Sequence, residues 1–149
     1  KASAAIFSGE PIPTVISVNN NILNGKFFKA ECDSNTDFTV YIGRVHSCRS
    51  GGCSDQSLTD KDSNYEFFDY FIIFDNGKRI KSVRVFNYEA THGQEITLRR
   101  WLNQFNGYDG NKSLRVGKEI DSISGATISV HGLVADIEQK TSMLKGMEF

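Results

Sequence analysis

Two hydrophobic periodicities divide the chain, one typical of strands and one typical of helices. Phe38, Val40 and Ile42 alternate with Thr39, Tyr41 and Gly43, which predicts a half-buried strand. Two β-rich runs, 65–74 and 79–88, flank the sequence Asp75-Asn76-Gly77. Because Asn-Gly readily adopts the positive φ angles of a tight turn, these runs predict a β-hairpin.

The period changes from two to about 3.6 after residue 97. Apolar residues at i, i+3, i+4 and i+7 predict a helix from Leu98 to Phe105, with Thr97 as its N-cap and Gly107 ending it. We assign Trp101 and Phe105 to the core on this spacing. A second amphipathic helix is predicted to begin at Thr127. Its apolar face comprises Val130, Leu133, Val134, Ile137 and Leu144.

Strands early in the chain and helices late favour an α+β fold, an antiparallel sheet with helices packed on one face. A long polar loop is predicted over residues 47–64, and a short last strand over 114–120. At 149 residues, the chain is expected to form a single domain, 1–149.

Charge and hydropathy exclude several classes of protein. The net charge is −1, and the 17 basic residues form no long run, so binding to nucleic acid is not expected. The longest apolar stretch, residues 70–74, is too short to cross a bilayer. Residues 1–5 lack the hydrophobic region of a signal peptide, so we expect any signal or anchor segment to lie outside this chain.

The segment Asp121-Ser-Ile-Ser-Gly-Ala-Thr127 directly precedes the second predicted helix. The first turn of a helix has unpaired backbone N–H groups, and its dipole favours an anion. Gly125 and Ala126 would let a phosphate approach the main chain closely. The spacing alone favours a simpler interpretation, in which Ser124 or Thr127 is a plain N-cap beside an ordinary Gly turn.

The pattern Asp-x-x-Ser-Gly-Ala-Thr resembles the flavinylation motif of the FMN-binding domain family. This family includes the extracytoplasmic flavin subunits of sodium-translocating NADH:quinone oxidoreductases and of Rnf-type complexes. The resemblance implies that a separate flavin transferase joins Thr127 to FMN through a phosphoester bond. It also implies a phosphate site formed by residues around that threonine, namely Asp121, Ser124, Gly125, Ala126 and Ile128.

The resemblance covers residues 65–143, about half of the chain. It includes Tyr88–Thr97, where we expect His92, Gly93, Glu95 and Thr97 to cover the flavin ring. Many family members read His-x-Glu-Thr-Pro-Gly there, whereas this chain has His-Gly-Gln-Glu and no proline. Arg44 and Arg99 are further candidates that would place positive charge near the ring, and Asp69 is interpreted as a solvated strand end.

The resemblance implies an electron carrier rather than an enzyme with its own small-molecule substrate. The expected location is the extracytoplasmic, periplasmic side of the cell envelope, and the expected partners are a flavin transferase and an envelope or membrane redox protein. The alternative is a module of the envelope that binds FMN non-covalently, or a sensing domain without electron-transfer duty.

The cysteines allow several interpretations. Cys48 and Cys53 flank a Gly-Gly turn and would form a small disulfide loop in an oxidising compartment, leaving Cys32 free and buried. A zinc site with His46 and the three cysteines, a redox-active dithiol, and two unpaired thiols are the alternatives. We expect the disulfide and no metal, which peptide mapping under non-reducing conditions would test.

Overall fold

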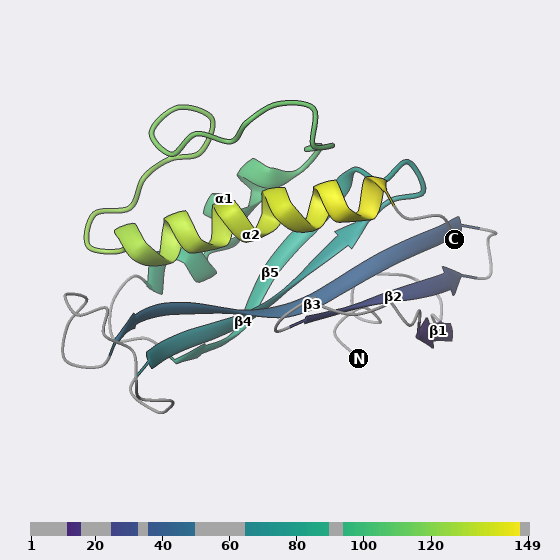
Figure 1. Ribbon diagram of the computed structural model, residues 1–149, viewed down its shortest axis with the longest axis horizontal. Coiled ribbons are helices and arrows are strands. Elements are labelled where there is room, and N and C mark those ends of the chain that lie inside the picture. The colour runs from purple at the N-terminus through teal and green to yellow at the C-terminus, as the bar shows by residue number, and fades with distance from the viewer. Residues whose placement is uncertain (1–11, 16–24, 33–35, 50–64, 90–93, 147–149) are drawn as a thin grey trace.

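A five-stranded antiparallel sheet in the order β1-β2-β3-β4-β5 is the frame of the protein (Figure 1). The computed structural model describes residues 12–15, 25–32, 36–49, 65–89 and 94–146. The strands are β1 (Ile12–Val15), β2 (Gly25–Cys32), β3 (Thr36–Arg49), β4 (Tyr65–Phe74) and β5 (Ile80–Glu89). The helical elements are η1 (Gln94–Thr97), α1 (Arg99–Leu102), η2 (Asn103–Phe105) and α2 (Thr127–Lys145).

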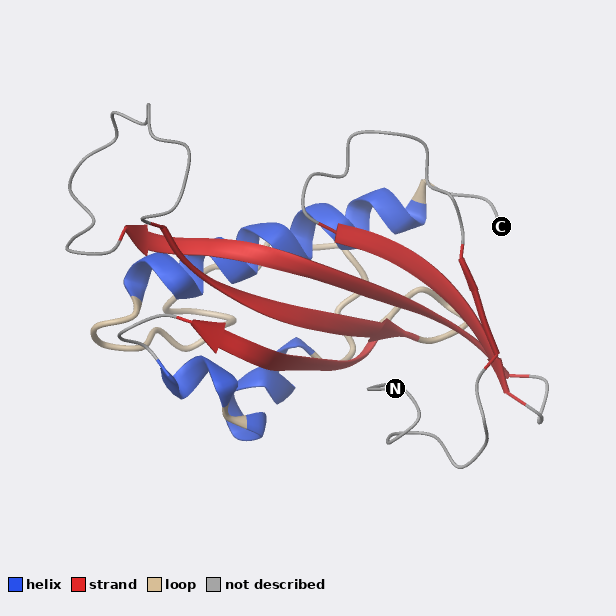
Figure 2. Cartoon of the chain, turned by 90° about the horizontal axis from the view of Figure 1, so that it is seen from below, coloured by secondary structure: helices blue, strands red, loops and turns tan. Residues whose placement is uncertain are grey.

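The helices gather on one face of this sheet, so the predicted α+β class is confirmed. Figure 1 shows α2 lying over the sheet with α1 behind it, and Figure 2 shows the sheet in front of α2 when the molecule is viewed from below. One apolar cluster fills the space between sheet and helices. Its largest fully buried members include Phe27, Tyr41, Phe68, Tyr70, Phe74, Phe105 and Leu133.

The apolar face that the sequence predicts for α2 is the face that the fold buries. Val130, Leu133, Val134, Ile137 and Leu144 are all at most 4% exposed. Gly132 allows the helix to approach β3 closely, because a Cβ at this position would lie 3.0 Å from Cγ1 of Val45. The helix and β3 are therefore in direct contact along the half of α2 that follows Thr127.

Strands β4 and β5 confirm the predicted hairpin, but its turn is longer than the two-residue Asn-Gly turn. Asp75 N–H donates to Arg79 O, and the Asp75 carboxylate accepts hydrogen bonds from the N–H groups of Gly77 and Arg79. The positive φ angle falls on Lys78, at 63°, rather than on Gly77. The Asp75 side chain thus selects a wider turn with a left-handed residue at its end.

Strand β3 is buried on both faces over residues 38–41, unlike the half-buried strand that the alternation predicts, whereas Ile42 on its outer face is exposed. Phe38 and Val40 belong to a second cluster on the outer face, away from the helices, whereas Tyr41 is fully buried beneath α2. The Tyr41 ring lies over two glycines, Gly25 and Gly43, which are opposite each other in the β2–β3 ladder. Tyr41 can occupy this place because neither glycine has a side chain.

The predicted helix 98–105 is divided into α1 and η2, and the extended backbone of Leu98 separates it from η1, which precedes it. Leu98 has an extended backbone and is 46% exposed, so it is not part of the buried face. Thr97 lies inside η1 and its hydroxyl donates to Gln94 O at 2.7 Å, so it is not the N-cap of α1. Trp101 and Phe105 are core residues as predicted, with their rings packed edge to face at 5.5 Å.

A polar cluster lies on the outer face of the sheet, and it corrects two predictions from the sequence. Asp69 is 9% exposed rather than solvated, and it accepts two hydrogen bonds from Arg44 and one from Asn87. The Arg44 guanidinium also lies 3.8 Å above the centre of the Phe67 ring. Arg44 is therefore engaged on the face opposite the helices, and it does not place its charge beside the start of α2.

Replacement of Gly43 by alanine should destabilise the protein, because the new Cβ would lie 2.2 Å from the Tyr41 hydroxyl oxygen and 2.6 Å from its ring. We expect Gly43→Ala to lower the free energy of unfolding by roughly 1–3 kcal/mol, measured by urea denaturation. Gly77→Ala is the matched control, since its nearest neighbour would be 3.4 Å away. Equal stability of the two variants would contradict the packing of Tyr41 over Gly43.

The hydrogen bonds from Arg44 hold the pKa of Asp69 below its ordinary value of 3.8. A carboxyl group whose pKa is depressed in the fold stabilises the protein above the unfolded pKa, and this contribution falls away as the pH drops through the folded pKa. Asp69→Asn should therefore be less stable than the wild type near pH 6, by about 0.5–1 kcal/mol, with the difference shrinking towards pH 2. Urea titrations at several pH values test this. A difference that grows on acidification would be the wrong sign.

Candidate functional site

The segment Asp121–Thr127, called the acceptor turn below, leads directly into α2. Thr127 is the first residue of the helix, as predicted, and its side chain is exposed. Ala126 is only 4% exposed, whereas Asp121, Ser124 and Gly125 are exposed. Gly125 has a φ of +82°, a value that glycine adopts without strain. The turn therefore presents the Thr127 hydroxyl at the surface while Ala126 anchors it in the core.

The start of α2 has the features of an anion site. No side-chain hydrogen bond caps this end of the 19-residue helix within the described chain. The first helical hydrogen bond runs from Val130 N–H to Ala126 O at 2.9 Å, so the N–H groups of Thr127 and Ile128 precede the hydrogen-bonded part of the helix. These groups and the helix dipole favour a negative charge at the N-terminus.

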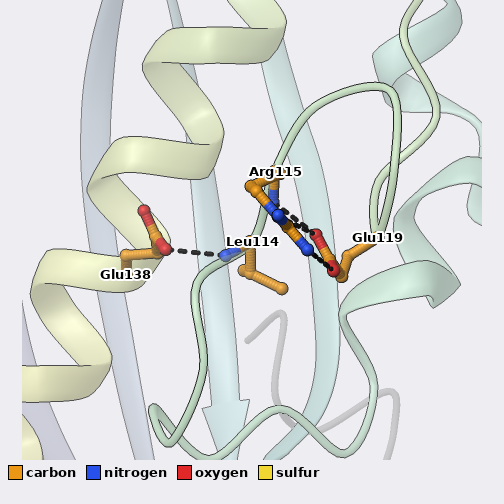
Figure 3. A network of polar contacts seen from close by, with 4 residues as sticks. All are labelled: Leu114, Arg115, Glu119 and Glu138. Atoms are coloured by element: carbon orange, nitrogen blue, oxygen red, sulfur yellow. Dashed lines mark hydrogen bonds and ion pairs between the residues drawn. The ribbon is translucent and has the colours of Figure 1, made fainter.

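A loop that runs beside α2 brings the chain to the acceptor turn, and Figure 3 shows how it is held. Leu114 N–H donates to the Glu138 carboxylate of α2 at 2.8 Å. Arg115 and Glu119 form an exposed ion pair with an N–O distance of 3.1 Å, and the hydrogen bond from Arg115 lowers the pKa of Glu119 to about 2. These contacts close a turn, so the strand predicted over 114–120 is wrong. Only one isolated bridge, Val116 with Ile120, is formed there.

The other end of this loop is attached to α1 and η2. Trp101 Nε1–H donates to Asp121 O at 2.9 Å, and Asp121 N–H donates to Gln104 Oε1 at 2.8 Å. The Gln104 amide in turn donates to Trp101 O at 2.9 Å. Both main-chain polar groups of Asp121 are therefore paired by two side chains of the preceding helical segment.

The predicted ring-binding segment lies only partly within the described residues. His92 and Gly93 fall outside them, while Glu95 and Thr97 belong to η1. Figures 1 and 2 both place η1 and the start of α2 at the same end of the sheet, where β5 ends. Glu95 is exposed, and the Thr97 hydroxyl is occupied by Gln94 O.

Tyr88 links these two parts of the site, and sequence reasoning did not identify its role. It is half-buried near the end of β5 and forms a hydrogen bond with Ser129, in the first turn of α2. Burial, and to a smaller extent the carboxylates of Glu66 and Glu95, raise the pKa of Tyr88 above its ordinary value of 10.0. η1 is in contact with β5, the strand that carries Tyr88, and Tyr88 in turn reaches the first turn of α2.

The outer face of the sheet carries a separate shallow hollow of about 330 Å³. Its lining includes Ile42, Arg44, Asp69 and Phe86. Since these residues lie on the side away from α2, the hollow is not part of the site at the acceptor turn. Two other large apolar residues are exposed, each to 46%. Ile128 directly follows Thr127, and Leu98 directly follows η1.

The remaining predictions about site chemistry concern residues that are only partly described. Cys53 lies outside the described residues, as do the side chains of Cys32 and Cys48, so the disulfide stays a prediction. In the part of the chain that the structure covers, no group of three His, Cys, Asp or Glu side chains could hold a metal ion. Among the same residues, no helix has the length and apolar character needed to span a membrane.

Comparison with known proteins gives one match. The sequence model of the FMN-binding domain family matches residues 67–140, which include β5, η1, α1, the acceptor turn and most of α2. No curated protein and no solved structure matches the chain. The matched segment therefore contains both the uncapped helix start and η1, and the match supports binding of FMN.

Removal of the Tyr88 hydroxyl should loosen the start of α2 without unfolding the protein. Tyr88→Phe keeps the ring stacked on Phe68, whose centre is 5.7 Å away, but loses the hydrogen bond to Ser129. We expect a loss of about 1 kcal/mol in the free energy of unfolding. A double-mutant cycle with Ser129→Ala measures the coupling directly. Strictly additive effects would show that the two hydroxyls do not interact.

Proposed function

Since this chain belongs, over residues 67–140, to the FMN-binding domain family, we propose that it is a flavoprotein electron carrier with FMN attached to Thr127 by a phosphoester bond. The single observation that carries this proposal is the position of Thr127. Its exposed hydroxyl stands at the uncapped start of a 19-residue helix, directly after the motif that the family uses. A threonine that merely capped the helix would precede its first turn and bond to it.

The residues around Thr127 fit a phosphate group. At Gly125, no heavy atom lies within 4 Å of the place that a Cβ would take, so the approach to the main chain is open. Ala126 adds only a methyl group, and it is turned into the core. Backbone N–H groups of Thr127 and Ile128 would hold the phosphate oxygens, with the positive end of the helix dipole behind them.

Formation of the bond requires a second protein. A threonine hydroxyl is a weak nucleophile without an adjacent base, and Ser124, Gly125 and Ala126 supply none. A flavin transferase would accept the proton of Thr127 Oγ1 and provide the flavin phosphate on a phosphoanhydride donor. The Oγ1–P bond then forms as the P–O bond of the anhydride breaks, and the other phosphate leaves.

Once bound, FMN supplies the electron chemistry, while the protein determines its position and surroundings. As the resemblance implies, we propose that the segment with His92, Gly93, Glu95 and Thr97 covers the ring. Support comes from the described part of this segment, η1, which is in contact with β5, the strand whose Tyr88 bonds to Ser129 in the first turn of α2. Leu98, which follows η1, and Ile128, in the first turn of α2, are each 46% exposed, so both elements carry exposed apolar surface.

We further propose that the carrier works on the extracytoplasmic side of the cell envelope, between an electron donor and an envelope or membrane redox partner. The resemblance to the extracytoplasmic flavin subunits supports this location, and so does the pair Cys48 and Cys53, which suits an oxidising compartment. The competing function is a module that binds FMN without a covalent bond.

Protein produced together with a flavin transferase should carry one FMN, seen as added mass that survives denaturation. Thr127→Val removes the oxygen but keeps the shape, so it should abolish attachment completely. Thr141→Val is the matched control, because Thr141 lies in the same helix, is fully buried, and its Oγ1 has no hydrogen-bond partner among the described residues. Flavin on Ser124 or Ser129 would refute the assignment, and a flavin released by denaturation would support the non-covalent module.

A further inference from the structure

Three hydrogen bonds among Trp101, Gln104 and Asp121 fix the first residue of the acceptor turn. Asp121 is exposed, yet its C=O accepts from Trp101 and its N–H donates to Gln104. The third bond, from the Gln104 amide to Trp101 O, determines which way that amide faces, so its oxygen points to Asp121. An exposed main-chain group would otherwise be satisfied by water.

The rest of the turn is anchored at its two ends, and Ile123 between them packs against the core. Ile120 is fully buried immediately before Asp121, and Ala126 is 4% exposed immediately before Thr127. A hydrogen bond from Ala126 N–H to Ile123 O closes the segment in between. The exposed residues Ser122, Ser124 and Gly125 are therefore presented on a base that is held by the core and by Trp101 and Gln104.

Trp101 and Gln104, which hold the turn, are themselves held in place by the helical segment and the core. Trp101 is 7% exposed, and its ring packs edge to face on Phe105, which is fully buried. Its indole N–H is therefore aimed at Asp121 O by the packing of the core rather than by the loop. Gln104 lies three residues further along, on the same side of the helical segment, and adds the second contact.

We propose that Trp101 and Gln104 are positioning residues for the attachment of FMN at Thr127, an inference that rests on the proposed function. They hold the acceptor turn in one conformation, so that the transferase meets a preformed hydroxyl and backbone surface. Transfer to a hydroxyl is fast only when the nucleophile is oriented towards the phosphorus atom, and a small misplacement costs a large factor in rate. The transferase would thus recognise the folded turn together with the side of α1 and η2 that supports it, rather than a linear motif.

The test compares attachment rates in the folded protein with a transferase at saturating flavin donor. Gln104→Ala removes both bonds of the side chain and should slow attachment roughly tenfold or more. Gln104→Glu keeps an acceptor for Asp121 N–H but loses the donor to Trp101 O, so it should recover most of the rate. Asn103→Ala is the matched control, because Asn103 is the exposed neighbour of Gln104 in η2.

A spectroscopic readout separates positioning from general damage. Trp101 is the only tryptophan, so its indole N–H gives a single NMR signal that reports the bond to Asp121 O. We expect this signal to move in Gln104→Ala and to stay in Asn103→Ala, with both variants folded at the assay temperature. Trp101→Phe keeps an aromatic ring but lacks the N–H, and it should slow attachment as well. If Gln104→Ala does not fold, the attachment rate of Trp101→Phe tests the positioning role instead.

Two outcomes would overturn the inference alone. One is a wild-type attachment rate in Gln104→Ala or Trp101→Phe, and the other is attachment to a peptide of residues 118–130 as fast as to the folded protein. Absence of FMN on Thr127 of the wild type in the presence of an active transferase would instead refute the proposed function, and this inference would fall with it.

Discussion

The burial of one face of α2 against the sheet is the constraint on which the rest of the structure depends. Five apolar residues of this helix are at most 4% exposed, and Gly132 lets the helix approach Val45 of β3. Their burial fixes the rotation of the helix about its axis and its depth over the sheet. The exposed position of Thr127 and the direction of the N–H groups at the start of α2 are consequences of that packing, because they belong to the same rigid element.

The approach to α2 is organised by polar contacts rather than by regular secondary structure. Glu138 holds Leu114, the pair Arg115–Glu119 closes a turn, and Trp101 and Gln104 hold Asp121. Each of these contacts pairs a main-chain group or a charge that a loop over a helix would leave to solvent. The loop can therefore lack strands and still deliver the acceptor turn at a fixed place, between α2 and the short helices behind it.

The features that sequence predicts well are those set by local pattern. The face of α2, the strands β4 and β5 and the core positions of Trp101 and Phe105 follow from periodicity, and Thr127 follows from a motif at a helix start. The sequence did not predict contacts made by side chains across distant segments. Asp75 widens the hairpin turn, Tyr41 packs on two glycines from different strands, and the extended backbone of Leu98 lies outside the helix that its spacing would have included. Likewise, nothing in the pattern around Tyr88 or Gln104 indicates Ser129 or Asp121 as a partner, because these pairs meet only when the sheet and helices have packed.

A polar cluster in the middle of α2 fixes the position of the helix along its own axis. The Tyr70 hydroxyl donates to Asp136 at 2.5 Å, Asp136 pairs with Lys140, and the Lys140 ammonium, on a residue that is 3% exposed, lies 5.3 Å from the centre of the Tyr41 ring. Contacts between apolar surfaces alone would allow the helix to slide. A shift of one residue would turn the Asp136 carboxylate away from Tyr70 and leave a buried charge with fewer partners, which is unfavourable. Asp136 is nine residues beyond Thr127, about 13 Å along an α-helix. The polar contacts of Asp136 therefore determine how far the rigid helix extends beyond the core, and with it the position of the Thr127 hydroxyl at the surface.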